Sequence, residues 1–318
     1  MTGLEWLESA PGWSQLPVVW LLIGEKVGGG RGRLAVGGFL VNLGLFTIKL
    51  TAGILSNSLA LVSDAFNSLL DVFSSTVVYI AVRVSSREAD EGHPFGHHRA
   101  EPISGLVVAI FAGVLGFEII KTGLQQMQTN RVDPNQIGFY AVMVLVISII
   151  TKTVVSTIFY NYAKKNNSPG LMASAIDSRN DVLVSAVVLF GVLGALRGWP
   201  KLDSLAAIAV GIFILWSGYS MGMENIGYLM GKAPEKPLIA RIESEALKVS
   251  GVLGVENIRA HYVGNYIHVE IQIRVDGNIP ISEAHEIGRE VEERVESLEE
   301  IDKCFIHLEP VDKDKNRV

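Results

Sequence analysis

The sequence predicts a helical membrane protein, with an all-α domain of six transmembrane helices followed by a cytosolic α+β domain. Two observations predict this fold class: an apolar composition and a change in charge density along the chain. Of the 318 residues, 49% are hydrophobic and 19% are charged, and the mean hydropathy is +0.34. A soluble domain carries about 25% charged residues, so this chain is too apolar to be one throughout. Charged residues are concentrated after residue 233. We therefore divide the chain into three parts: a cytosolic or interfacial leader (residues 1–33), a transmembrane domain (34–231) and a cytosolic C-terminal domain (232–318).

Each of six apolar runs has about the 20 residues that cross a hydrocarbon core about 30 Å thick. The runs are Leu34–Leu55, Leu59–Val82, Ile103–Ile120, Ile137–Tyr160, Leu171–Leu196 and Leu205–Ile226. An even number of spans places both termini on one side, and most of the basic residues that flank the runs fall on that side. By the positive-inside rule both termini are cytoplasmic, which predicts a multi-pass protein of the cell (inner) membrane. Asp203 follows Pro200 and is predicted to cap the sixth helix.

The polar C-terminal part shows alternating helical and strand patterns. Ile267–Val275 places an apolar residue at every second position, as a half-buried strand does. The predicted order is helix, strand, strand, helix, strand, which gives a three-stranded sheet with helices on one face. These elements are expected at Lys236–Ser250, Val255–Tyr262, Ile267–Val275, Ser282–Leu298 and Cys304–Leu308. A lipid bilayer is an expected partner of the chain, and a nucleic acid is not.

The second apolar run contains three polar residues that share one helix face. Asp64, Asn67 and Asp71 follow one another at spacings of three and four residues. An acidic side chain at the centre of a bilayer costs roughly 2.5–3.5 kcal/mol on insertion scales. A bound cation, a proton pathway or an aqueous cavity would offset this cost.

The fifth run carries Asp177 and Asp181, again four residues apart. Because the second and fifth spans run in opposite directions, packing them together sets Asp71 level with Asp177 and Asn67 level with Asp181. This predicts a site of three carboxylates and one amide oxygen. Hard oxygen donors suit manganese, magnesium or calcium better than zinc or copper. The alternative is a polar stripe that only joins the two helices by hydrogen bonds.

Other charged residues in the apolar runs are assigned separate roles. Asp64 is interpreted either as an outer relay ligand or as the partner of Arg179 or of a helix end. Glu118 and Lys152 are expected to be interfacial or water-facing. Lys49 is expected to extend its ammonium group toward the membrane surface.

The loop between the second and third spans contains a second candidate site. Asp90, His93 and His97 place one carboxylate and two imidazoles within eight residues. Such a set could hold a metal ion such as zinc. The alternative is a polar turn in which the two histidines bond to the backbone.

These motifs resemble those of the cation diffusion facilitators over about residues 34 to 310. The resemblance is carried by SLALVSDAFNSLLD in the second span, HPFGHHRAE after it, D-x-x-x-D in the fifth span and the order of the cytosolic elements. It implies a homodimeric exporter of divalent metal, working by alternating access with proton antiport, whose cytosolic domain has a ferredoxin-like, metallochaperone-like fold. The family's transport positions match Asn67, Asp71, Asp177 and Asp181.

The residues at these positions resemble those of the manganese branch. Zinc-transporting members have Asp at the first position and His at the third, where this chain has Asn67 and Asp177. The expected activity is therefore Mn²⁺/H⁺ antiport. Fe²⁺ is the nearest alternative substrate, followed by Zn²⁺ and Cd²⁺.

The resemblance also implies two auxiliary metal sites. Asp90, His93 and His97 match the family's loop site. In the cytosolic domain, zinc members have His where this chain has Glu256 and Gln272. The residues that remain for a regulatory site at the dimer interface are His285, His307 and Glu309. Zinc or manganese is the candidate occupant of both sites. For the cytosolic site, the alternative is that these are ordinary surface histidines. No other cofactor is expected.

A metalloenzyme and a metal-binding protein that does not transport are the two alternative classes of function. A metalloenzyme within the membrane would need a catalytic motif such as His-Glu-x-x-His, which the sequence lacks, so no enzymatic activity is expected. A metal sensor or scaffold that does not transport remains the alternative from a different class.

Overall fold

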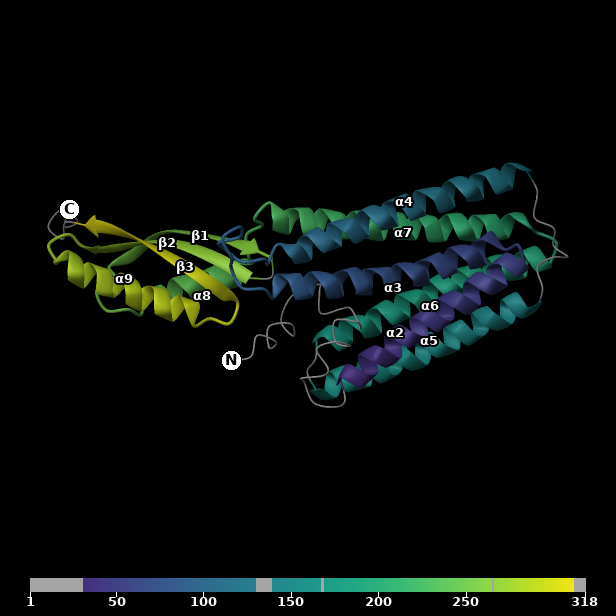
Figure 1. Ribbon diagram of the computed structural model, residues 1–318, viewed down its shortest axis with the longest axis horizontal. Coiled ribbons are helices and arrows are strands. Elements are labelled where there is room, and N and C mark those ends of the chain that lie inside the picture. The colour runs from purple at the N-terminus through teal and green to yellow at the C-terminus, as the bar shows by residue number, and fades with distance from the viewer. Residues whose placement is uncertain (1–30, 130–138, 167–168, 265, 312–318) are drawn as a thin grey trace. The chain divides into compact units, whose positions relative to one another are not determined.

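The computed structural model describes residues 31–129, 139–166, 169–264 and 266–311, in two compact units (Figure 1). The first unit holds the described residues of Met1–Val84 and Ile103–Glu224, and the second holds those of Ser85–Pro102 and Asn225–Val318. Most of the predicted leader lies outside the described residues. The helices are α2 (Arg31–Leu55), α3 (Leu59–Ser85), α4 (Ala100–Thr129), α5 (Phe139–Asn166), α6 (Pro169–Leu196), α7 (Lys201–Leu229), α8 (Lys236–Ala246) and α9 (Ile281–Glu296), and the strands are β1 (Gly254–Val263), β2 (Tyr266–Asp276) and β3 (Ile301–Val311).

The helices α2 to α7 are each long and apolar enough to cross a membrane, which confirms the six predicted spans. Their candidate membrane segments have mean hydropathies of 1.5 to 2.3. The helices extend beyond several of the predicted runs because polar residues continue the helix past the apolar segment. The candidate spans are Gly37–Leu55, Leu59–Ser85, Ala100–Gln128, Phe139–Lys165, Ser174–Leu196 and Lys201–Leu229.

Glycine residues allow α4 and α7 to pack closely side by side (Figure 1). A Cβ atom on Gly116 would lie 2.8 Å from the carbonyl oxygen of Gly211, and one on Gly218 would lie 2.8 Å from the Cβ of Ala112. In a membrane, where lipid tails are as apolar as side chains, such close backbone contact is a main source of helix association. The two helices therefore form a tight pair within the first unit.

Asp203 caps a helix other than the predicted one. It lies in the first turn of α7, and its buried carboxylate reaches the start of α3 instead. Its Oδ2 atom accepts hydrogen bonds from the backbone N–H groups of Leu59 at 2.8 Å and Ala60 at 3.2 Å. The hydroxyl of Ser58 donates to Oδ1 at 2.5 Å. The prediction was wrong because α7 begins two residues before Asp203, which frees the side chain to satisfy the N–H groups at the N-terminus of α3.

We expect Asp203→Ala to lower the free energy of unfolding by about 2 kcal/mol or more, since it leaves three donors, two of them in buried hydrogen bonds, without their acceptor. Thermal unfolding of the purified chain in detergent measures the loss. Asp203→Asn is the matched control, because it keeps one acceptor oxygen and should give a smaller decrease. An unchanged melting temperature for Asp203→Ala would contradict this role.

The second unit contains a three-stranded sheet in the order β1, β2, β3. β1 and β2 are antiparallel, whereas β2 and β3 are parallel, because α9 crosses between them. Alternate residues of β2, among them Val269 and Ile271, point into a core shared with Ile242 of α8 and Val291 of α9. The predicted sheet with its helices on one face is confirmed.

The loop between α3 and α4 belongs to this second unit. The rings of His98 and Tyr266 have centroids 4.4 Å apart. Gly264 has a φ of +67°, and a Cβ atom there would lie 2.2 Å from the carbonyl oxygen of His98. Burial lowers the pKa of His98, which favours its neutral form in this contact. Glycine at position 264 thus allows the loop and the sheet to meet.

Candidate metal centre

Residues of α3 and α6 meet inside the helical bundle. The side-chain amide of Asn67 donates a hydrogen bond to Oδ1 of Asp181 at 3.0 Å, and both residues are buried. The second and fifth spans therefore face each other through the residues chosen from the sequence. This contact places an amide group and a carboxylate side by side among apolar helices.

Lys152 of α5 contributes a positive charge to the same place. Its side chain is 2% exposed, and its ammonium group donates a hydrogen bond to Oδ2 of Asp181. The same Nζ atom lies 3.7 Å from Oδ2 of Asp71. The expectation that Lys152 would be interfacial or water-facing was wrong, because two acidic side chains provide the partners that a buried lysine requires.

Asp71 has a carboxylate oxygen that is available for a ligand. Its Oδ2 atom is buried and has no hydrogen-bond partner among the described residues. Asp177 lies one turn before Asp181 on α6 and interacts electrostatically with Asp71 and Asp181. The Lys152 ammonium group thus lies near the carboxylates of Asp71 and Asp181, whereas the side chain of Asp177 is exposed on α6.

A second buried ion pair lies one to two helical turns from this region. Nζ of Lys49 lies 2.9 Å from Oδ2 of Asp64, and both side chains are 1% exposed. Ser185 of α6 donates to the same carboxylate at 3.0 Å. The expectation that Lys49 extends to the membrane surface was wrong, since its ammonium group also donates to Ser68 and Ser185.

The partner of Asp64 is therefore Lys49 and not Arg179, which corrects one of the two interpretations of Asp64. Arg179 lines a cavity of about 290 Å³ between α5 and α6, together with Thr153 and Ser156. Glu118 lies on an exposed part of α4, where its carboxylate is 3.0 Å from the ammonium group of Lys121. Asp64 of α3 pairs with Lys49 of α2 and accepts a hydrogen bond from Ser185 of α6, so it links three helices. Glu118 and Arg179 are not among these contacts.

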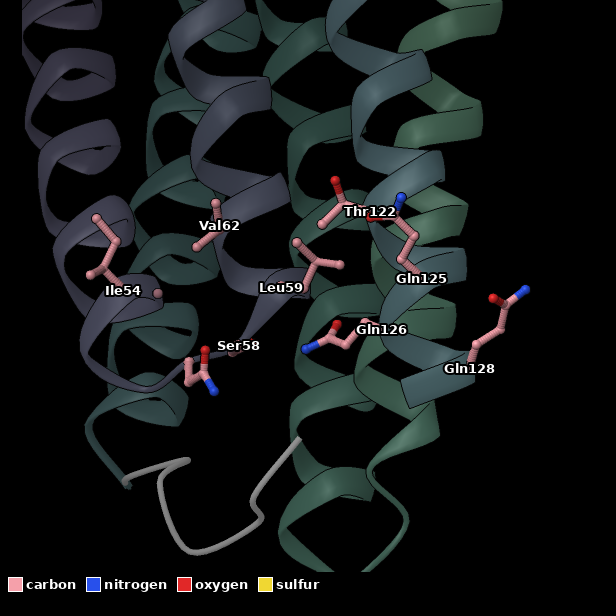
Figure 2. Close-up of a pocket in the computed structure, with 10 residues that line it drawn as sticks. Ile54, Ser58, Leu59, Val62, Thr122, Gln125, Gln126 and Gln128 are labelled. Atoms are coloured by element: carbon pink, nitrogen blue, oxygen red, sulfur yellow. The ribbon is translucent and has the colours of Figure 1, made fainter. Parts of the chain in front are cut away.

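A cavity of about 730 Å³, with a mixed polar and apolar lining, opens at the end of α3 away from the loop between α3 and α4. Figure 2 shows Ser58 and Leu59 at the start of α3 on one side and Gln125 and Gln126 of α4 on the other. The hydroxyl of Ser204 donates to Oε1 of Gln126 at 3.0 Å. Neutral amide and hydroxyl groups therefore share the lining of this cavity with apolar side chains.

The loop residues Asp90, His93 and His97 form a compact group of potential ligands. One potential ligand atom from each residue lies within 4.8 Å of the other two. In the described part of the chain, this is the one group of three His, Cys, Asp or Glu residues whose ligand atoms lie so close together. Nδ1 of His93 lies 3.3 Å from Asp90 Oδ1, and Nε2 of His97 lies 3.4 Å from Asp90 Oδ2. Both imidazoles therefore face the carboxylate, as metal ligands would.

The charge of Asp90 suits this arrangement. The backbone N–H of His93 donates to its carboxylate at 2.7 Å and holds the pKa of Asp90 below its ordinary value. Asp90 is thus an anion at neutral pH. Nδ1 of His97 is buried and has no hydrogen-bond partner among the described residues. One carboxylate and two imidazoles are a donor set typical of zinc.

The cytosolic candidates come together only in part. Nε2 of His307 lies 3.2 Å from Oε1 of Glu309, and both are on β3. His285 is exposed on α9 and does not join them in a group of three within the described residues of one chain. Another histidine, His268, is buried instead, with Nε2 3.2 Å from Oδ2 of Asp302, and this contact lowers the pKa of Asp302.

Comparison with known proteins decides the family. Residues 36–230 match the model of the cation efflux transmembrane domain. Residues 234–311 match that of the cation efflux protein cytoplasmic domain. The chain belongs to the cation efflux family, the cation diffusion facilitators. It is thus a divalent cation efflux transporter with six candidate spans and a cytoplasmic C-terminal domain, and it is not an enzyme.

Two relatives are similar to most of the chain. An uncharacterised transporter of Methanocaldococcus jannaschii, MJ0449, is 36% identical over 85% of this chain and 95% of its own. The manganese efflux system protein MneS of Bacillus subtilis is 29% identical over 91% of this chain and 97% of its own. Among solved structures, the MamM CTD is similar over 24% of this chain and 98% of its own, with 32% identity and a TM-score of 0.24.

Proposed function

We propose that this cation efflux protein exports Mn²⁺ from the cytoplasm by alternating access, in exchange for protons. The observation that carries the proposal is the buried contact between Asn67, Asp181 and Lys152, with Asp71 beside it. A positive charge already lies among oxygen atoms of α3 and α6 at this point in the bundle. A transported cation would find the same oxygen atoms there.

The choice of manganese rests on the donor atoms. The four proposed ligands are Asn67, Asp71, Asp177 and Asp181, which offer oxygen and neither imidazole nor thiolate. Such sites favour manganese over zinc. The similarity to the manganese efflux protein MneS points in the same direction. Fe²⁺ is the nearest alternative substrate, with Zn²⁺ and Cd²⁺ after it.

Proton coupling would use the same carboxylates. Because none of the four ligands is a histidine, the coupled protons must bind to acidic side chains. Asp71, Asp177 and Asp181 repel one another once the metal has left, and protons taken up from the outer side would relieve that repulsion. In this proposal, water enters from the end of α3 at which the cavity beside Ser58 opens.

The proposed assembly is a homodimer in the inner membrane, with both termini cytoplasmic. The family model that residues 234–311 match is named as a dimerisation domain. Contacts between two copies of a domain of this size would enlarge its small core. The proposed domain boundaries are those predicted from the sequence, with residues 34–231 in the membrane and 232–318 in the cytoplasm.

Transport in inverted membrane vesicles tests the proposed function. Uptake of manganese, iron, zinc and cadmium is measured with and without a pH gradient, in vesicles with and without the protein. We expect the largest uptake for manganese, together with proton release from the vesicles. If no metal moves, the transport proposal fails, and if zinc or iron moves fastest, the metal assignment fails.

We also propose that the loop site binds zinc. His97→Ala is expected to remove one bound zinc ion per chain, because two remaining ligands hold zinc poorly. Metal content is measured after dialysis by elemental analysis. The matched control is Glu91→Gln, which changes an exposed carboxylate of the same loop. Equal zinc content in the wild type and His97→Ala would contradict a site at this loop.

A further inference from the structure

The inference concerns Lys152 and rests on the proposed function. A lysine in the middle of a membrane helix needs a partner, and Lys152 has two acidic ones, Asp181 in direct contact and Asp71 at 3.7 Å. These are two of the four proposed metal ligands. The ammonium group therefore lies where the transported cation would lie.

Charge repulsion prevents the two cations from sharing this place. A divalent ion bound by both Asp71 and Asp181 would lie within about 4 Å of the ammonium group, where two like charges repel by several kcal/mol even at an intermediate dielectric constant. Binding of metal thus requires Lys152 to move away. The reverse also holds, because departure of the metal leaves the largely buried carboxylate of Asp181, with Asp71 beside it, in need of a counter-charge.

The surroundings of Lys152 offer a second position for its ammonium group. The lysine stem has four carbon atoms and reaches several positions from one backbone site. Ser148 lies one turn earlier on α5, and side chains of a helix lean toward its N-terminus. The Ser148 hydroxyl is buried and has no hydrogen-bond partner among the described residues. It could accept a hydrogen bond from the displaced ammonium group.

We propose that Lys152 is a built-in cation that alternates with the transported metal between Asp71 and Asp181. When the metal is bound, the side chain moves toward Ser148. When the metal has left, the ammonium group returns and balances the carboxylates while the empty carrier changes its direction. Lys152 keeps its charge throughout and acts as a competitor of the metal and as a substitute for it.

Removal of the ammonium group gives opposite effects on binding and on net transport. We expect Lys152→Gln to bind Mn²⁺ at least about tenfold more tightly, since its competitor is gone. Net metal uptake should fall at least about tenfold, because the empty carrier lacks its counter-charge. Exchange of Mn²⁺ for labelled Mn²⁺ should persist, because that cycle never requires the empty carrier to change its direction. Binding is measured by titration calorimetry on the full chain in detergent, and the two transport modes are measured in reconstituted vesicles.

Two further variants keep the test decisive. Lys152→Arg retains the charge and the ion pair, so this variant should fold. The planar guanidinium group of arginine should bind the Asp181 carboxylate more tightly than the ammonium group does and should therefore weaken Mn²⁺ binding at least about tenfold. Lys121→Gln removes an exposed lysine of α4 and should leave the affinity unchanged. The proposal is overturned if neither Lys152 variant changes the affinity in the stated direction, or if binding, exchange and net uptake all fall together. A wild type that moves no metal would overturn the proposed function instead, whatever the calorimetry shows.

Discussion

Replacing Asp181 by asparagine is expected to abolish metal export and to weaken Mn²⁺ binding more than about 100-fold, since even ligand-supporting residues contribute 10- to 100-fold at metal sites. Asp181 is the most connected residue of the candidate site. It accepts a hydrogen bond from Asn67 and pairs with Lys152. Uptake by reconstituted vesicles and calorimetric titration measure the two effects.

The control for this variant separates binding from folding. Asp181→Asn leaves Lys152 with Asp71 as its acidic neighbour at 3.7 Å, so the variant should also unfold at a lower temperature. The double variant Asp181→Asn with Lys152→Gln removes both charges and should recover thermal stability without recovering export. Export at the wild-type rate by Asp181→Asn would show that this carboxylate is not a ligand.

Replacing Asn67 by aspartate is expected to change the ratio of zinc to manganese transport by roughly tenfold, a difference of about 1.4 kcal/mol in relative affinity. The amide of Asn67 donates a hydrogen bond to Asp181 at 3.0 Å and thereby orients that carboxylate. An aspartate there would repel Asp181 and add a fourth negative charge to the site. A more negative and less oriented site should discriminate less among divalent ions. Transport of both metals is measured in the same vesicle preparation.

Asn67→Ala is the matched control for this change. It removes the amide without adding charge, so it should weaken the binding of all metals while leaving their ratio nearly unchanged. If Asn67→Asp and the wild type gave the same metal profile, Asn67 would have no part in selecting the ion.

The sequence predicted the membrane spans well because their physical cause is local. A run of about 20 apolar residues meets the length requirement of a bilayer whatever its neighbours are. The same holds for Ile267–Val275, where the alternation of apolar residues indicates a strand covered on one face. It also predicted that polar residues of the second and fifth spans meet, because both spans carry acidic residues that require partners.

The partners of the lysines could not be predicted in this way. Periodicity places Lys49 and Lys152 on a helix, but it does not indicate which helix each one faces. The default expectation for a lysine in a span is to reach the membrane surface. Both lysines are instead buried beside carboxylates of other helices. The presence of Lys49 and Lys152 in the same set of apolar runs as several aspartates was a signal that could have suggested such pairs.

Locating the bound Mn²⁺ in a crystal is the most direct test of the proposed metal site. Crystals of the full-length protein grown with Mn²⁺ would be measured at a wavelength where manganese scatters anomalously. An anomalous peak is expected between α3 and α6, in contact with oxygen atoms of Asp71 and Asp181, and the Lys152 ammonium group is expected to be displaced from both. A map with no peak between these helices, and with Lys152 still bound to Asp181 at saturating Mn²⁺, would contradict this expectation.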